Sequence, residues 1–257
     1  MRVLRCQSGE RGGLRDAGRN TQAQRAFEFS VPTGIFCGLS SATIIDCRIL
    51  ECQTNDGAGL FLDPSDAVVD RCMFSGNVAE RGGGIWSGWG KAEIKNCVIT
   101  GNGAVHGAGV CFGGPGTNRL FGCTVAANLA GVEGGGIYAI NPLLLERCIV
   151  WDNCSFTGVG EIWCDEADVR CSDIDTTGVR PYAPVEYDED CVYTDPQFCL
   201  AAPCGWHTEG DWSLDAASIC LPQNSPCGEL IGALGRGCGA TPATETTWGA
   251  IKAMFRE

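Results

Sequence analysis

Eighteen cysteines are the residues of this sequence with the most evident chemistry, and six of them recur at intervals of 23 to 26 residues. The recurring positions are Cys47, Cys72, Cys97, Cys123, Cys148 and Cys171. They could be redox groups or metal ligands, but cysteine inside a strand also behaves as a small apolar residue, which favours a buried column of thiols. With two histidines, His106 and His207, and no Cys-x-x-Cys pair, the sequence predicts no metal site and no cofactor.

A set of aromatic side chains recurs at the same interval as the cysteines. It comprises Phe36, Phe61, Trp86, Tyr138 and Trp163, with Cys111 in the matching place of one repeat and Trp89 close by. If the apolar residue before each ring points inward, the ring itself points outward. Aromatic rings pack against the apolar faces of sugars, so the set with Trp89 predicts a carbohydrate-binding surface. The alternative is a ladder of rings that stack on one another or lie under loops.

The carboxylates and bases that polysaccharide cleavage requires do not gather in the sequence. A lyase needs a base beside an acidic calcium site, and a hydrolase needs a pair of carboxylates. The charged residues near the cysteines are of mixed sign: Asp46, Asp70, Arg71, Lys95, Glu146, Arg147 and Arg170. Mixed signs along one face are typical of a solvated surface. We therefore expect a non-catalytic protein, with a polysaccharide lyase or a glycoside hydrolase as the alternative.

A repeat of about 25 residues must position all of these side chains. An asparagine follows four of the cysteines by five residues, at Asn77, Asn102, Asn128 and Asn153. A glycine marks the next turn, at Gly59, Gly84, Gly109, Gly136 and Gly160; an apolar residue follows directly, except that Ile162 comes one residue late. No segment between these markers has a helical period. The repeat predicts an all-β solenoid of short parallel strands, with cysteines and aliphatic residues inside and asparagines stacked as a ladder.

Paired motifs within the repeats resemble those of a known family. Phe74-Ser-Gly-Asn77 followed by Gly82-Gly-Gly-Ile85 resembles the FxxN and GGA(I/L/V) motifs of polymorphic outer-membrane proteins, and the right-handed parallel β-helix repeats of secreted bacterial proteins. Related pairs are Ile99-Thr-Gly-Asn102 with Gly107-Ala-Gly-Val110, and Val125-Ala-Ala-Asn128 with Gly134-Gly-Gly-Ile137. The resemblance covers residues 34 to about 175. It implies a right-handed parallel β-helix of about five to six rungs and a surface or secreted location, and it carries over no catalytic residue.

The repeat divides the chain into four expected regions. Residues 1–33 are a basic N-terminal arm or a truncated first rung, residues 34–175 the β-helix, residues 176–238 a cysteine-rich cap, and residues 239–257 a linker with a short amphipathic tail. The cap resembles the closing segment that wraps the last rung of secreted bacterial β-helix proteins. Its six cysteines predict up to three disulfides among fifteen pairings: Cys191, Cys199, Cys204, Cys220, Cys227 and Cys238. Cys204 and His207 have the spacing of a zinc-ligand pair, but a disulfide is the better assignment for Cys204 because no second histidine lies nearby. The tripeptide Asn153-Cys-Ser155 has the pattern of a glycosylation acceptor.

Charge and hydropathy narrow the classes of partner. The net charge of −13 and the isoelectric point near 4.6 disfavour binding to nucleic acid and to anionic membranes. No apolar run is long enough for a transmembrane helix. The basic opening lacks the apolar core of a signal peptide, so we expect a truncated product. We expect a monomeric adhesin, passenger or structural module, extracellular or on a bacterial cell surface, that binds a polysaccharide or a host-surface glycan.

Overall fold

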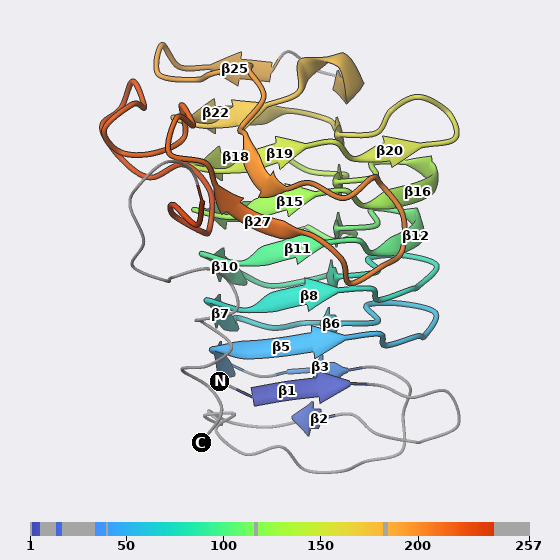
Figure 1. Ribbon diagram of the computed structural model, residues 1–257. Coiled ribbons are helices and arrows are strands. Elements are labelled where there is room, and N and C mark those ends of the chain that lie inside the picture. Colours follow the sequence, from blue (N-terminus) through green and yellow to red (C-terminus); the bar gives the residue numbers. More distant parts are fainter. Residues whose placement is uncertain are drawn as a thin grey trace.

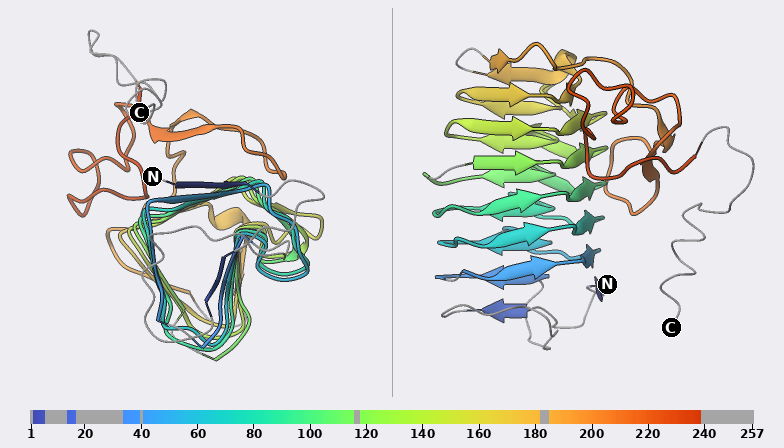
Figure 2. Two further views of the ribbon diagram at one scale, coloured as in Figure 1. Left: turned by 90° about the horizontal axis from the view of Figure 1, so that it is seen from below. Right: turned by 90° about the vertical axis from the view of Figure 1, so that its left-hand side faces the viewer.

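The computed structural model describes residues 2–5, 14–16, 34–39, 41–115, 118–181 and 185–238; for 2–5, 14–16 and 180–181 it describes the backbone alone. The fold is a parallel β-helix of triangular cross-section, in which each rung contributes one strand to each of three sheets (Figures 1 and 2). The expected all-β solenoid is confirmed. The expected linker and tail at 239–257, and most of the expected arm at 1–33, lie outside the described residues.

The three long sheets have seven or eight strands each. Sheet 1 comprises β2 (Leu14–Asp16), β3 (Ile35–Cys37), β6 (Leu60–Leu62), β9 (Ile85–Ser87), β13 (Val110–Phe112), β17 (Ile137–Ala139), β21 (Ile162–Cys164) and β24 (Val179–Pro181). Sheet 2 comprises β4 (Thr43–Ile45), β7 (Val68–Asp70), β10 (Glu93–Lys95), β14 (Asn118–Phe121), β18 (Leu143–Glu146), β22 (Ala167–Arg170) and β25 (Val185–Tyr187). Sheet 3 comprises β1 (Arg2–Arg5), β5 (Cys47–Leu50), β8 (Met73–Ser75), β11 (Val98–Thr100), β15 (Thr124–Ala126), β19 (Ile149–Trp151) and β23 (Asp173–Ile174).

Short elements complete the described chain. A fourth sheet at the turn from sheet 3 to sheet 1 comprises β12 (Gly103–His106), β16 (Leu129–Glu133) and β20 (Cys154–Ser155). A 3-10 turn, η1, spans Thr176–Gly178, and β26 (Phe198–Leu200) pairs antiparallel with β27 (Asp211–Leu214). The coil also continues past residue 175, because β24 and β25 pair with β21 and β22, and Val192 bridges Asp173. We call residues 34–192 the coil.

One residue turns the chain from sheet 2 to sheet 3 in each rung. These corner residues have φ between 42° and 59°: Asp46, Arg71, Asn96, Gly122, Arg147 and Cys171. Cys171 is thus a corner residue, and its assignment to the buried cysteine column was wrong. Ser172 holds that place, since its Oγ accepts a hydrogen bond from the Cys148 N–H at 3.0 Å. Cys191 resumes the column one rung later, with its thiol 3.3 Å from the Val169 carbonyl.

The remaining members of the cysteine column are free thiols that point into the coil. Cys72, Cys97, Cys123 and Cys148 are buried, and Cys47 at the lower end is partly exposed. Burial raises the pKa of the Cys97 and Cys148 thiols well above the ordinary value, so both stay protonated at neutral pH. The column of small apolar residues expected from the sequence is therefore confirmed for these positions.

The asparagine ladder is also present and is fully buried. The backbone N–H and the side-chain amide of Asn77 both donate to the Oδ1 of Asn102, each at 3.0 Å. Asn102 donates in the same way to Asn128, and Asn128 to Asn153. Each amide also donates to a carbonyl one rung away, as the Asn128 amide does to Ile99. The asparagine of each rung thus accepts the hydrogen bonds that the asparagine of the rung below donates, and buried polar groups need such partners.

Residues 193–238, here called the C-terminal segment, lie along the outer face of sheet 3, next to β11, β15 and β19 (Figures 1 and 2). The expectation that this part wraps the last rung was wrong for these residues. The disulfides differ as well: Cys154–Cys204, Cys171–Cys227 and Cys199–Cys238. Among the described residues, the C-terminal region thus holds three bridges, but only Cys199–Cys238 joins two of the six cap cysteines. The other two bridges reach back to the coil, and Cys191 and Cys220 are not disulfide-bonded.

Candidate functional site

The aromatic side chains predicted to bind carbohydrate form two stacks on the outer face of sheet 1. Phe36, Phe61 and Trp86 stack with ring centroids 4.9 and 4.5 Å apart and planes within 15° of parallel. Tyr138 and Trp163 stack at 4.5 Å and 9°. The spacing between rungs, about 4.8 Å, is what brings the rings to stacking distance. The rings therefore cover much of one another's faces.

Between the two stacks the column is interrupted by Cys111, which is buried. The Arg81 guanidinium lies 5.8 Å from the Trp86 ring centroid at this gap. The predicted residues differ in exposure: Trp86 is 7% exposed, whereas the neighbouring Trp89 is 60% exposed. A sugar that packs against a ring face therefore has its best platform at Trp89.

The charged face of sheet 2 consists of ion pairs. Arg71 lies 2.9 Å from Asp46, and Arg119 lies 2.7 Å from Glu146, in each case across neighbouring rungs. Exposed pairs of this kind contribute at most about 1 kcal/mol each to stability. The carboxylates thus alternate with bases and do not converge on one point, as the mixed signs in the sequence indicated.

A cavity of about 440 Å³, which no sequence pattern indicated, lies between the last rungs and the C-terminal segment. Asp152, Glu161 and Asp175 contribute carboxyl groups to the wall that the coil provides. Residues 201–204 form the opposite wall, and none of the lining residues is basic. Carboxyl groups from neighbouring rungs thus share this cavity.

Two of the three carboxyl groups lie at the ends of sheet 3 strands. Asp152 follows β19, and its partial burial together with the negative charges of Asp175 and Asp195 raises its pKa. Asp175 follows β23, where its carboxylate accepts hydrogen bonds from the N–H of Thr177 at 2.9 Å and from its hydroxyl at 2.7 Å. Those bonds hold Asp175 as the N-cap of η1.

Glu161 is the third carboxyl group, and it ends the asparagine ladder. Its Oε1 accepts the Asn153 N–H at 2.8 Å, and its Oε2 accepts the Asn153 side-chain amide at 2.6 Å. Burial raises the pKa of Glu161 to about 8, against the effect of these two hydrogen bonds. A carboxyl group with a raised pKa that lies beside further carboxyl groups suits acid–base catalysis. Here, however, both oxygens already have partners in the coil.

Glu161 occupies a position that is glycine in the rungs below. Ile137 and Ile162 are paired neighbours, so the residues before them, Gly136 and Glu161, are equivalent. A β-carbon on Gly136 would lie 2.9 Å from the Asn153 Nδ2, which shows how closely this column approaches the ladder. The glutamate side chain can thus reach the open end of the ladder. The sequence did indicate this difference, because an apolar residue directly follows the glycine in the lower repeats, whereas Ile162 comes two residues after Gly160.

Two other sequence motifs acquire structural roles. Asn153 is buried and engaged in the ladder, so the acceptor tripeptide cannot be glycosylated in the folded chain. Cys204 forms a disulfide, as expected, and the His207 Nε2 lies 2.6 Å from the Pro203 carbonyl oxygen. In the part of the chain that the structure describes, no group of three His, Cys, Asp or Glu side chains could hold a metal ion.

Comparison with known proteins identifies one match. The model of a family described as right handed beta helix region matches residues 33–161, about half of the chain. No curated protein and no solved structure matches the chain. Among the described residues, none forms a helix of the length and hydropathy needed to cross a membrane.

Proposed function

Because the chain belongs to the right-handed β-helix family, we propose that it is a non-catalytic module of a secreted or cell-surface protein, with an outer surface that binds glycans. The observation that carries the non-catalytic part is the unbroken pairing of sheet 3 from β5 to β23. Clefts of carbohydrate enzymes usually form where loops interrupt such a coil. A fold alone does not decide function, so the residues of the surface must support the proposal.

Disulfides support the extracellular location. Each of the three described bridges joins cysteines at least 39 residues apart in sequence. Disulfides of this kind persist in oxidising compartments and are rare in the cytosol. The same proposal includes two further points: the repeats are of the polymorphic outer-membrane-protein type, and the protein is a monomer.

Glycan binding rests on the aromatic column and on Trp89. The stacks of sheet 1 provide a rigid apolar ridge, and Trp89 adds a ring that is 60% exposed beside it. Asp63 fixes the Trp89 backbone, because its Oδ1 accepts the Trp89 N–H at 3.1 Å. A platform with a fixed backbone loses little entropy when a sugar binds.

A glycan array tests the proposal directly. We expect wild-type protein to bind at least one glycan class, and Trp89→Ala to weaken that binding about 10-fold, since aromatic contacts of this kind contribute around 1 kcal/mol or more. Trp206→Ala is the matched control, because Trp206 is similarly exposed, at 64%, but lies on the C-terminal segment. A wild-type protein that binds no glycan, or equal losses in both variants, would refute binding at sheet 1.

The acidic cavity favours a second candidate, a glycoside hydrolase. It brings Asp152 and Asp175 into one cavity with Glu161, whose pKa is about 8. Release of reducing ends from a polysaccharide panel without the unsaturated ends that a lyase leaves, abolished by Asp175→Asn but not by Asp168→Asn on the exposed face of sheet 2, would establish the hydrolase and overturn the non-catalytic proposal. Absence of release from every polymer supports the first candidate.

A further inference from the structure

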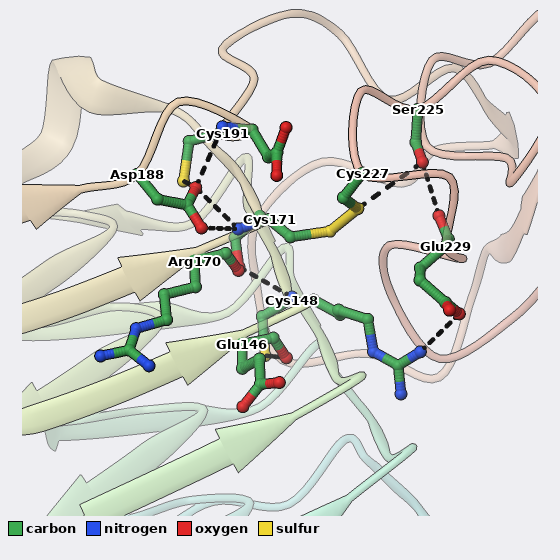
Figure 3. The surroundings of a disulfide bond; sticks show 12 residues. Glu146, Cys148, Arg170, Cys171, Asp188, Cys191, Ser225, Cys227 and Glu229 are labelled. Atoms are coloured by element: carbon green, nitrogen blue, oxygen red, sulfur yellow. Dashed lines mark hydrogen bonds and ion pairs between the residues drawn. A yellow bond between two sulfur atoms is a disulfide. The ribbon is translucent and has the colours of Figure 1, made fainter.

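The C-terminal segment is attached to the coil by two disulfides at different heights. Cys154 on β20 is bonded to Cys204. Cys171, at the corner before β23, is bonded to Cys227, as Figure 3 shows. Arg147 adds an ion pair to Glu229 beside the second bridge, at 2.9 Å. The third bridge, Cys199–Cys238, lies within the segment. Only the first two bridges therefore resist separation of the segment from the coil.

Apolar contacts between the segment and the coil cover one face of sheet 3. Trp212 is 2% exposed and packs in one cluster with Val98 and Ala126 of sheet 3. A second cluster joins Ile231 to Ile149 higher on the same sheet. Removing the segment would expose this apolar face to water, which is unfavourable.

Main-chain hydrogen bonds between the segment and the coil are few. The N–H of Gly205 donates to the Ala127 carbonyl at 3.0 Å, and that of His207 donates to the Gly101 carbonyl at 2.8 Å. The N–H of Gly232 donates to the Arg147 carbonyl at 2.7 Å. Within the segment, regular pairing is limited to β26 with β27. An isolated two-stranded hairpin is marginal in water. The segment thus depends on its attachment to the coil, whereas the coil makes its own ladders.

Both tethers are reachable from solvent, the second through Cys227, which is partly exposed. Cys154 and Cys204 are partly exposed, and both line the 440 Å³ cavity. A small thiol can enter a cavity of this size and attack either sulfur atom. In the cysteine column, Cys72, Cys97, Cys123 and Cys148 are buried and take no part in such exchange.

We propose that residues 193–238 are a redox-released clasp, which two disulfides hold on sheet 3 and which a dithiol reductant frees without unfolding the coil. In each step a thiolate of the reductant attacks one sulfur of Cys154–Cys204 or Cys171–Cys227, and the mixed disulfide resolves to the oxidised reductant. Each protein disulfide gains two electrons and two protons and becomes two thiols. The face that the clasp uncovers is the apolar outer face of sheet 3. The inference does not depend on glycan binding.

Hydrogen exchange of the folded protein, with and without dithiothreitol, tests the clasp. Closing a loop of about 50 residues favours the attached state on the order of 10³-fold in the chain-entropy description. We therefore expect peptides that contain Gly205 and His207 to exchange at least about 10-fold faster after reduction, with peptides of β14 to β19 unchanged. Unchanged protection of the segment, or loss of protection in segment and coil at one rate, overturns the proposal.

Cysteine variants separate release from general loss of disulfides. A variant with Cys154, Cys171, Cys204 and Cys227 all changed to Ser should behave as the reduced wild type does. The matched control, Cys199→Ser with Cys238→Ser, keeps both tethers and should retain protection at Gly205 and His207 under oxidising conditions. Equal exchange in the two variants contradicts the clasp. If the fourfold variant does not fold, reduction of folded wild-type protein decides the question.

Discussion

Each rung of the coil repeats the contacts of the rung below it, whereas the C-terminal segment is held by individual contacts and by covalent bonds. In the coil, Asn102 is satisfied by Asn128, and Ile99 pairs with Val125. In the segment, Trp212 and the Cys154–Cys204 bridge have no copy one rung away. A coil of this kind gains stability from nearest-neighbour stacking, so damage to one rung should spread to both neighbours. Damage to the segment should stay local.

The largest expected effect is loss of a central asparagine from the ladder. Asn128→Ala removes the oxygen that accepts two hydrogen bonds from Asn102, and it removes the donors to Ile99 and Asn153. Several buried groups then lack partners, so we expect the free energy of unfolding of the coil to fall by about 4 kcal/mol. Chemical denaturation measures this loss. Asn55→Ala, at an exposed position, is the control; an equal and small loss in both variants would show that the ladder adds little.

The end of the ladder predicts a pH dependence of stability. Folding raises the pKa of Glu161 from 4.5 to about 8, so the folded state binds the proton more tightly than the unfolded state. The stability from this group is complete below about pH 4.5 and is lost as the pH rises through 8, which amounts to roughly 4 kcal/mol between pH 5 and pH 9. Asp173, with a pKa raised by burial to about 7, acts in the same direction.

Glu161→Gln should flatten this profile. Its single oxygen can accept both donors of Asn153, as the Oδ1 of each asparagine does in the lower rungs. Thermal unfolding from pH 4 to pH 9 compares the variant with wild type and with Glu166→Gln, which changes an exposed carboxylate. A wild-type protein more stable at pH 9 than at pH 5 would contradict the assigned role of Glu161.

The difference between the two regions also explains what the sequence could predict. Equivalent positions in stacked rungs face equal surroundings, so the same residue type is selected every 25 residues. The columns through Cys97, Asn102 and Ile85 were visible for that reason. Where the interval changed, the alignment slipped by one residue: Cys171 was placed inside although it turns the corner, and Glu161 was overlooked beside Gly160.

The C-terminal segment carried no such repetition, and its position could not be predicted. Its cysteines indicated disulfides, but pairing depends on which side of the coil the segment follows. The partners of Cys204 and Cys227 lie 50 and 56 residues earlier in the chain. The cavity lined by Asp152 and Asp175 arises only because the segment crosses that edge, so no local pattern could reveal it.

A smaller and more local effect is expected at the centre of the clasp. Trp212→Ala removes a buried ring from the cluster with Val98 and Ala126, which should weaken docking of the segment by about 3 kcal/mol. Because the coil makes its own ladders, its denaturation midpoint should hardly change. Limited proteolysis measures how firmly the segment is docked, and far-UV circular dichroism measures unfolding of the coil. Trp206→Ala, at an exposed position of the segment, is the control. Joint loss of segment and coil in Trp212→Ala would show that the two regions unfold as one unit.

The smallest effect is expected where the clasp crosses the coil most closely. Gly101 has a φ of 60°, and a β-carbon there would lie 2.1 Å from the His207 carbonyl oxygen. Gly101→Ala should therefore displace the segment by a combination of backbone strain and overlap, at a cost of about 2 kcal/mol in docking. Ala127, at the equivalent corner one rung higher, already carries a β-carbon at a φ of 57° and accepts the Gly205 N–H. The coil thus tolerates alanine at this corner, and we expect Gly101→Ala to speed hydrogen exchange at His207 without destabilising the coil. A loss of coil stability in Gly101→Ala instead would show that the strain lies in the rung itself.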